Sequence, residues 1–172
     1  FLFSPACGGG IPFLHNLALA AQTDRVTEVG GILNGTTNYI LTRMFSSGAS
    51  FEAALAEAQA KGYAEADPTA DVEGHDAARK IAILGALASG KIVPSDAIHT
   101  EGIRAIRAED VATASKIGCS IKLLGRYLHT EGGDTFLLVA PFMLPADCPL
   151  SGISDVYNGV LVRGNFVGDV MF

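Results

Sequence analysis

The segment from Tyr63 to Lys80 concentrates the side chains that can do chemistry. Its last carboxylate, Asp76, stands four residues before Lys80, and an apolar stretch from Ile81 to Ala88 follows directly. Carboxylates beside a lysine at the start of a helix can hold a small cationic substrate and move a proton to or from it. The segment holds five carboxylates, those of Glu65, Asp67, Asp71, Glu73 and Asp76.

Asp76 and Lys80 are spaced to share one face of a helix, with the acid before the base. A solvated pair of this kind would contribute only about 0.3–0.5 kcal/mol and would carry no chemistry. The same face continues to Ile83 and Leu87, which are apolar. We therefore expect the pair to lie at the edge of a buried stripe, where a partly desolvated lysine is suited to proton transfer.

The carboxylates before this helix do not form a calcium loop of the EF-hand type. Thr69 stands where that pattern needs a ligand, and Val72 stands where it needs glycine. A solvated acidic loop remains the alternative to a binding site. Pro68 stiffens the segment, which favours a positioned site.

Two further segments could meet a ligand through their backbones. Residues 8–10 are three consecutive glycines but match no phosphate-binding motif, so a tight turn, a carbonyl ion site and close ligand approach all remain open. Residues 34–38, Asn-Gly-Thr-Thr-Asn, predict a helix start capped by Asn or Thr. Such a start can also offer N–H groups to a ligand carboxylate.

Composition excludes several classes of protein. The chain has 172 residues, a net charge of −6 and no cluster of Lys and Arg, which argues against a nucleic-acid partner. No apolar run reaches the roughly 18 residues of a membrane span, so no membrane partner is expected. Three cysteines lie far apart, which suggests reduced thiols and a cytoplasmic protein. The four histidines show no zinc-ligand spacing with them.

Hydrophobic periodicity predicts an α+β fold with a mixed or antiparallel sheet, as a single domain. Both ends have the look of cut ends, so we expect residues 1–172 to be one domain of a longer chain. The expected helices are Phe13–Ala21, one from residues 34–38 to Phe45, one from Ser50 or Phe51 to Lys61, His75–Ala88 and Ala108–Ile117. The expected strands are Val26–Leu33, Gly102–Ile106, Ser120–Tyr127, Thr135–Pro141, Asn158–Val162 and Asn165–Met171.

Several segments, taken in order, resemble homoserine dehydrogenase along essentially the whole chain. The most specific is residues 60–80, and residues 30–41 and 121–125 add to it. The Gly-Gly-Gly-Ile-Pro at residues 8–12 and the motifs at residues 155–160 and 168–172 also fit. The family reduces aspartate 4-semialdehyde to homoserine with NAD(P)H, on the way to threonine, isoleucine and methionine.

The resemblance implies a substrate-binding and dimerisation domain that is α+β with a mixed sheet covered by helices. In the family this domain follows an NAD(P)-binding Rossmann domain, which this sequence does not contain. The resemblance therefore leaves open whether NAD or NADP is preferred, and whether a regulatory domain responds to threonine.

The resemblance also assigns roles to residues by position. Lys80 matches the lysine that donates or accepts the proton. Asp76 and Glu65 match residues that bind the amino-alcohol substrate, and Asp71 matches another acid of that pocket. The pocket lining falls on Tyr63, Gly35 and Thr36.

The family binds a monovalent cation, typically sodium, near the glycine loop. By position the backbone carbonyls of Cys7, Gly9 and Ile11 would be ligands. Ser4 stands where the family has a glutamate, and a hydroxyl is a weaker, uncharged ligand.

Two other interpretations remain beside the catalytic domain of a homoserine dehydrogenase. One is an inactive dimerisation or amino-acid-binding module of the same ancestry, and the other is an oxidoreductase of a different semialdehyde. The set of Lys80, Asp76 and Glu65 favours the first reading, because an interaction surface does not need it. The apolar strands near residues 136–139 and 160–162 need cover on both faces, which predicts a homodimer.

Overall fold

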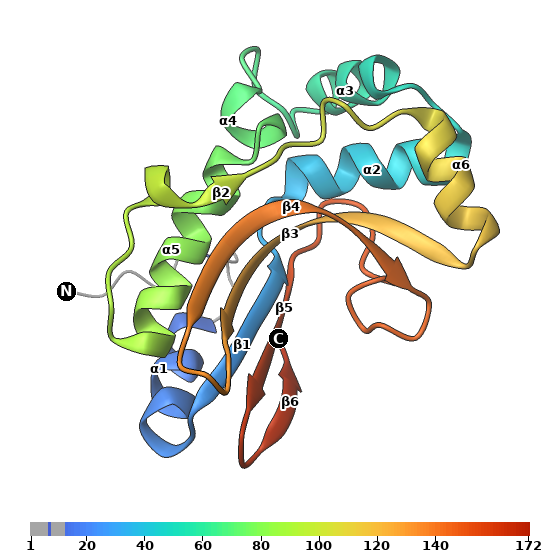
Figure 1. The fold of residues 1–172 in the computed structure, drawn as a ribbon. Coiled ribbons are helices and arrows are strands. Elements are labelled where there is room, and N and C mark those ends of the chain that lie inside the picture. The colour runs from blue at the N-terminus through green and yellow to red at the C-terminus, as the bar shows by residue number, and fades with distance from the viewer. Residues whose placement is uncertain (1–6, 8–12) are drawn as a thin grey trace.

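A six-stranded sheet forms the centre of the structure, a computed structural model that describes residue 7 and residues 13–172 (Figure 1). The strand order is β2-β4-β3-β1-β5-β6. Only β2 and β4 pair in parallel, and every other neighbouring pair is antiparallel. The predicted α+β class with a mixed sheet is confirmed. The strands are β1 (Val26–Ile32), β2 (His99–Thr100), β3 (Cys119–His129), β4 (Thr135–Pro145), β5 (Gly159–Gly164) and β6 (Gly168–Met171).

The five predicted helices are all present, and each ends within about two residues of its expected end. Ser50 caps α3 as predicted, since its side chain accepts a hydrogen bond from the N–H of Ala53. Gly62 follows that helix with a left-handed φ of 74°. The helices are α1 (Phe13–Thr23), α2 (Gly35–Ser47), α3 (Phe51–Ala60), α4 (Thr69–Val72), α5 (His75–Ser89) and α6 (Ala108–Lys116), and Ser95–Ala97 form a short 3₁₀ turn.

Three sequence predictions are corrected. The segment Gly102–Ile106 is not a strand. A Cβ at Gly102 would collide with the carbonyl of Val72, and the N–H of Ile103 donates to that same carbonyl at 2.8 Å. The segment therefore packs on α4, and its fully buried Ile103 lies in the core. The strand in this part of the chain is β2, which ends just before the segment. The acidic segment is not all loop, because it contains α4. The last strand begins at Gly168 and not at Asn165.

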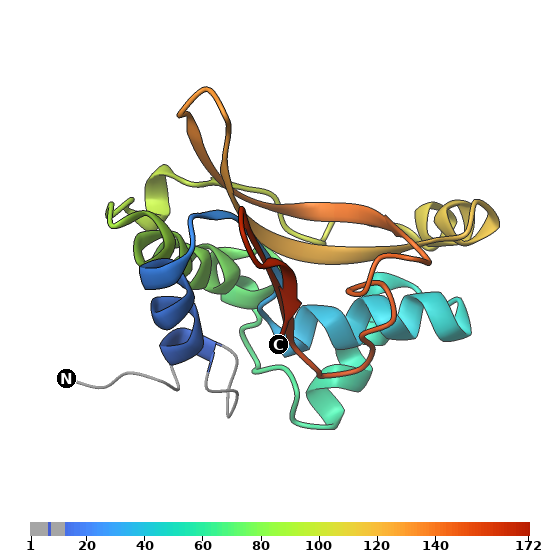
Figure 2. The same cartoon turned by 90° about the horizontal axis from the view of Figure 1, so that it is seen from below.

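Helix α5 lies along the sheet and contacts β1, β3 and β4. Gly125 of β3 allows this close approach, since a Cβ there would press on Ile81 of α5 and on Leu33. The main core lies between these helices and the sheet. A smaller apolar cluster, which contains Ile32, Leu124, Leu144 and Leu150, lies under the segment between β4 and β5. Figure 2 shows that segment running beside α2. No helix in the described part of the chain is long and apolar enough to cross a membrane.

Candidate active site

The site forms where the chain leaves β1 and enters α2. Asn34 is the N-cap of α2, and its side-chain oxygen accepts hydrogen bonds from the N–H of Thr37 at 2.9 Å and from its hydroxyl at 3.1 Å. The Asn34 amide nitrogen points the other way. It donates to Asp71 at 2.7 Å and to Asp76 at 2.9 Å. One buried asparagine therefore starts a helix and holds two carboxylates together.

Lys80 completes this cluster from the first turns of α5. Its Nζ lies 2.6 Å from Oδ2 of Asp76 and donates to the backbone carbonyl of Leu33 at 2.8 Å. The side chains of Lys80 and Asp76 are 21% and 28% exposed, so the pair is only partly covered, as expected for the edge of a buried stripe. An ammonium has three protons, and two of them are committed here. Within the part of the chain that the structure describes, the third N–H of Lys80 has no acceptor and can meet a ligand.

The two carboxylates also keep acceptors in reserve. Within the described residues, Oδ1 of Asp76 and Oδ2 of Asp71 accept no hydrogen bond. Two carboxylates and one ammonium give the cluster a net charge of about −1. Such a cluster attracts a cationic group, and its remaining lone pairs can accept from an ammonium.

A local feature at Gly74 fixes where α5 starts. Gly74 is the N-cap with a left-handed φ of 82°, a conformation that glycine adopts without steric cost. A Cβ there would also press on Thr100 and Val139, so the start of α5 lies directly against β2 and β4. Asp76 in the first turn then lies near the positive end of the helix, which stabilises its charge.

The first turn of α2 forms the neighbouring wall. The N–H groups of Gly35 and Thr36 have no acceptor among residue 7 and residues 13–172, as is usual for the first turn of a helix. The Thr36 hydroxyl donates to the backbone carbonyl of Tyr63 at 2.6 Å. The Tyr63 ring packs on Tyr39, with centroids 5.0 Å apart. The structure therefore brings Gly35, Thr36 and Tyr63 together beside free N–H groups that suit a ligand carboxylate.

The other three carboxylates diverge from the cluster. Asp67 accepts from the N–H and hydroxyl of Thr69, the first residue of the short α4. Glu73 forms an ion pair with Arg104 at 2.6 Å. Glu65 is exposed, and the structure shows only its backbone carbonyl engaged, by the side chain of Gln59. The predicted site set is thus split, with Asp71, Asp76 and Lys80 at its centre and Glu65 outside their hydrogen-bond network.

Cys7 lies against this site. Its buried thiol is oriented toward the backbone carbonyl of Lys80, with Sγ 3.9 Å from that oxygen. Burial raises the pKa of the Cys7 thiol to about 11, against the opposing effect of the Lys80 charge. The thiol is therefore protonated at neutral pH and is not a nucleophile. The other residues expected around a cation, Ser4, Gly9 and Ile11, lie outside the described residues.

Sequence reasoning missed two supporting groups. Asn34 was recognised only as a candidate helix cap. Glu57 of α3 accepts hydrogen bonds from Tyr39, Lys61 and Arg43, which ties α3 to α2 behind the Tyr39–Tyr63 contact. The spacing of Glu57 and Lys61 could have predicted their ion pair, but not its link to α2. In the described part of the chain, no three acidic, His or Cys side chains gather as a metal site would require.

Comparison with known proteins identifies the family of the chain. The family model described as homoserine dehydrogenase matches residues 12–172. Homoserine dehydrogenases of Synechocystis and Bacillus subtilis are 48% and 42% identical to the chain. The alignments cover 99% of this chain but only 40% and 39% of those proteins. The chain thus spans about two fifths of the length of these relatives.

Solved structures give the same result. The crystal structure of a homoserine dehydrogenase from Thiobacillus denitrificans superimposes with a TM-score of 0.94 at 42% identity, covering 98% of this chain and 39% of that one. A hyperthermophilic archaeal homoserine dehydrogenase mutant in complex with NADPH has a TM-score of 0.81 at 27% identity, covering 98% of this chain and 47% of that one. The fold, the family model and the relatives agree, and the chain belongs to the homoserine dehydrogenase family.

Proposed function

We propose that this chain is the substrate-binding and proton-transferring part of a homoserine dehydrogenase, which interconverts L-homoserine and L-aspartate 4-semialdehyde with NAD(P). The observation that carries the proposal is the cluster at the start of α5. Lys80 is bonded to Asp76, and Asn34 joins Asp76 to Asp71. An inactive module of the same ancestry would have no need for an ammonium bonded to one carboxylate that an asparagine joins to a second.

The two charged ends of the substrate suit the two walls of the site. The α-ammonium of homoserine would donate hydrogen bonds to the free oxygens of Asp76 and Asp71, with Glu65 closing on it from the exposed loop. Its α-carboxylate would bind the N–H groups of Gly35 and Thr36 at the positive end of α2. Tyr63 would line the pocket between them.

Lys80 would handle the proton of the reacting oxygen. When the aldehyde is reduced, negative charge develops on its oxygen, and the free N–H of Lys80 donates a proton there. When homoserine is oxidised, a neutral Lys80 takes the hydroxyl proton. Asp76 and the carbonyl of Leu33 fix the amine in place, so that its free N–H has a defined direction.

The described residues do not fit a dinucleotide on their own. Among residue 7 and residues 13–172 the sheet is almost entirely antiparallel, and no glycine-rich turn joins a parallel strand to a helix. We therefore assign NAD(P) binding to a part of the protein outside this chain. Bound there, the nicotinamide would exchange a hydride with the substrate carbon, while the residues above hold the substrate and the proton.

We also propose a monovalent cation, such as Na⁺, at the backbone carbonyls of Cys7, Gly9 and Ile11. The position of Cys7 beside Lys80 would place the cation close to the substrate pocket. Ser4 would supply a hydroxyl in place of a carboxylate, so we expect weak binding. Titrating Na⁺ against K⁺ in the activity assay of the full-length protein tests this, and identical rates in both salts would remove the cation from the mechanism.

A homodimer is the assembly that the sheet favours. Along β4, Leu137 and Val139 face α5, because a Cβ at Gly85 or Gly74 would press on them. The alternate residues of β4 and the end of β6 lie on the opposite face, where Phe136 is 51% exposed and Met171 is 45% exposed. On this face the exposed apolar side chains lie beside the ion pairs of Glu28 with Arg126 and Arg163, a mixture that suits a protein interface, and a second copy would cover it. Light scattering of the full-length protein should give twice the chain mass, and a monomer would exclude this assembly.

The activity test is NAD(P)⁺-linked oxidation of homoserine by the full-length protein. We expect turnover in the wild type and a loss of kcat of at least about 1,000-fold in Lys80→Ala. Lys116→Ala is the matched control, because this exposed lysine at the end of α6 takes part in no ion pair of the described structure. Full activity of Lys80→Ala would refute the assignment. A folded wild type that binds NADPH but leaves homoserine unchanged would favour another semialdehyde or the inactive module.

A further inference from the structure

Residues 153–157, in the connection between β4 and β5, lie along α2 like a strap, and we call them the strap. The Asn38 amide nitrogen donates to the strap carbonyls of Ile153 at 3.2 Å and Tyr157 at 3.0 Å. The N–H of Asp155 donates to Oγ1 of Thr42 at 3.0 Å. The strap is therefore hydrogen-bonded to α2 near both of its ends and in its middle.

The strap also presses on the first turn of α2. A Cβ at Gly35 would lie only 2.7 Å from the carbonyl oxygen of Val156, so only a glycine allows this approach. Gly35, Asn38 and Thr42 are three and four residues apart and share one face of the helix. The strap thus covers a continuous face of α2 that begins at its N-terminus.

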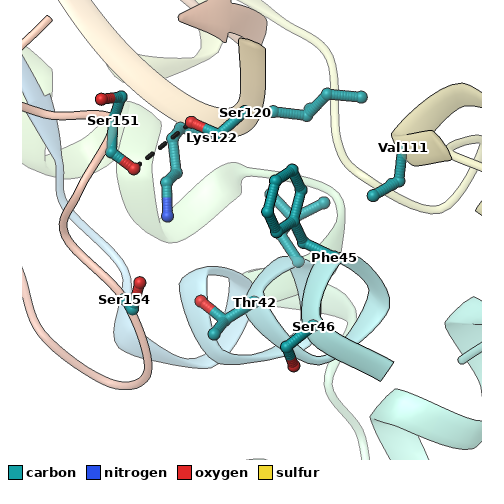
Figure 3. Close-up of a pocket in the computed structure, with 10 residues that line it drawn as sticks. Thr42, Phe45, Ser46, Val111, Ser120, Lys122, Ser151 and Ser154 are labelled. Carbon is teal, nitrogen blue, oxygen red and sulfur yellow. Dashed lines mark hydrogen bonds between the residues drawn. The ribbon is translucent and has the colours of Figure 1, made fainter. Parts of the chain in front are cut away.

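Lys122 of β3 binds the strap and the helix at the same point. It is 4% exposed, and its Nζ donates to the carbonyl of Ile153 and, at 3.1 Å, to Oδ1 of Asn38. Figure 3 shows its side chain reaching from the strand toward α2 and ending between Thr42 and Ser154. One amine therefore joins three elements, namely β3, α2 and the strap.

This arrangement costs stability in two places. No carboxylate of the described structure forms an ion pair with Lys122, and burial lowers the pKa of its amine to about 8, against the opposing effect of the Asp155 charge. Asp155 has a left-handed φ of 56°, the only such non-glycine residue among those described. An apolar side chain at position 122 would avoid the first cost but would leave Oδ1 of Asn38 without its donor, and the Ile153 carbonyl with the Asn38 amide alone. The buried amine of Lys122, which costs stability, therefore holds in place a strap with a strained backbone at Asp155.

We propose that Lys122 is a positioning residue, which clamps the strap on α2 and thereby fixes the first turn of α2 against the bound substrate. This inference rests on the proposed role of the Gly35 and Thr36 N–H groups as the site of the substrate carboxylate. When the clamp is released, the strap carbonyl that presses on Gly35 can move away. The first turn then loses its fixed position, and the substrate must order it on binding.

The test measures kcat and KM for homoserine in the full-length protein. Lys122→Met removes both donors with little change in side-chain volume, and we expect KM to rise about tenfold while kcat changes less than about threefold. Lys122→Arg should recover most of the KM, because a pocket of about 130 Å³, lined by Thr42, Ser46, Ser151 and Ser154 among others, lies beside the amine and can admit a larger donor. Hydrogen exchange of residues 150–157 should speed up in Lys122→Met and return in Lys122→Arg.

Two milder variants keep the test decisive if Lys122→Met does not fold. Thr42→Val removes the acceptor of the Asp155 N–H and should raise KM about threefold. Ser46→Ala alters the same pocket without touching the strap and should change neither constant.

A folded Lys122→Met or Thr42→Val with faster exchange but an unchanged KM would overturn the positioning role and leave only a structural one. Failure of the proposed function would look different, because Lys80→Ala would then retain activity whatever happens at Lys122.

Discussion

Lys80 and Lys122 place the same functional group in opposite settings. Lys80 lies at the start of a helix, is partly exposed, and bonds a carboxylate and a carbonyl. Lys122 lies in a strand, is almost fully buried, and bonds a carbonyl and an amide oxygen. Each ammonium makes two hydrogen bonds in the described structure, but one acceptor of Lys80 is a carboxylate, whereas both acceptors of Lys122 are neutral groups.

The contrast bears on our proposal that Lys80, and not Lys122, transfers the proton. A carboxylate partner and access to solvent let Lys80 stay close to a charged ligand at low cost. The hydrogen bonds of Lys122 to neutral acceptors join β3 to α2 and to the strap. Burying its charge among them lowers the stability of the fold. The following predictions test this difference.

The largest expected effect is the contribution of Lys122 to the pH dependence of the free energy of unfolding. Its pKa falls from an ordinary 10.5 to about 8 in the folded state. Between pH 8 and 10.5 the unfolded chain therefore binds more protons, and stability from this group rises with pH. In urea unfolding of the full-length protein, the free energy of wild type minus that of Lys122→Met should increase by up to about 3 kcal/mol from pH 7.5 to 10.5. A difference that stays flat over this range would show that the buried amine carries no such penalty.

Asp76→Asn tests the matched setting of Lys80. The variant keeps the size of the side chain and removes the charge that faces the ammonium of Lys80 and, in our proposal, that of the substrate. We expect kcat/KM for homoserine to fall about 100-fold, which corresponds to about 2.7 kcal/mol, with most of the change in KM. Stability should fall by about 1 kcal/mol or less, because the pair is partly exposed and solvent screens its charges. An unchanged KM and kcat would remove Asp76 from substrate binding.

Variants at Asn34 can distinguish its two roles, which are capping α2 and holding Asp71 and Asp76 together beside Lys80. Asn34→Ala removes both the cap and the bridge, so we expect a stability loss of about 1 kcal/mol and a higher KM. Asn34→Asp keeps a capping oxygen but turns the bridging donor into an acceptor that faces Asp71 and Asp76. Because the cap stabilises α2, the Tm of Asn34→Ala should be lower than that of Asn34→Asp. KM for homoserine should rise in both variants. A normal KM in Asn34→Asp would mean that the bridge to the carboxylates has no functional weight.

The helices and most strands were accessible from sequence because their signals are local. The apolar period around Ile81 predicted α5, and Ser50 predicted the start of α3. Gly102–Ile106 failed for a nonlocal reason. Its apolar residues suggested a strand, but Gly102 serves the close approach to Val72, thirty residues earlier, which no local pattern can show.

The same holds for the site: its local features could be predicted from sequence, and its contacts between distant residues could not. The spacing of Asp76 and Lys80 predicted their ion pair, which the structure contains. Asn34 was visible as a cap, yet its bonds to Asp71 and Asp76 span 37 and 42 residues and exist only in the fold. Lys122 was visible as one charged residue in an apolar strand. Its partners, Asn38 and the strap, lie on either side of it in sequence and far away.

Glu57→Gln gives the smallest expected effect. It tests a group whose pKa is shifted by hydrogen bonds, in contrast to Lys122, whose pKa is shifted by burial. Hydrogen bonds from Lys61, Tyr39 and Arg43 lower the pKa of Glu57 to about 2, from an ordinary 4.5. The folded state then binds fewer protons than the unfolded chain between pH 4.5 and 2, so this contribution to stability is full above pH 4.5 and is lost as pH falls toward 2. The stability of wild type minus that of Glu57→Gln should therefore shrink on acidification, whereas the matching difference for Lys122→Met should change only above pH 7.5. KM for homoserine should move less than about twofold, because Glu57 supports Tyr63 only through Tyr39. A larger rise in KM would place the Glu57 network in direct control of the pocket.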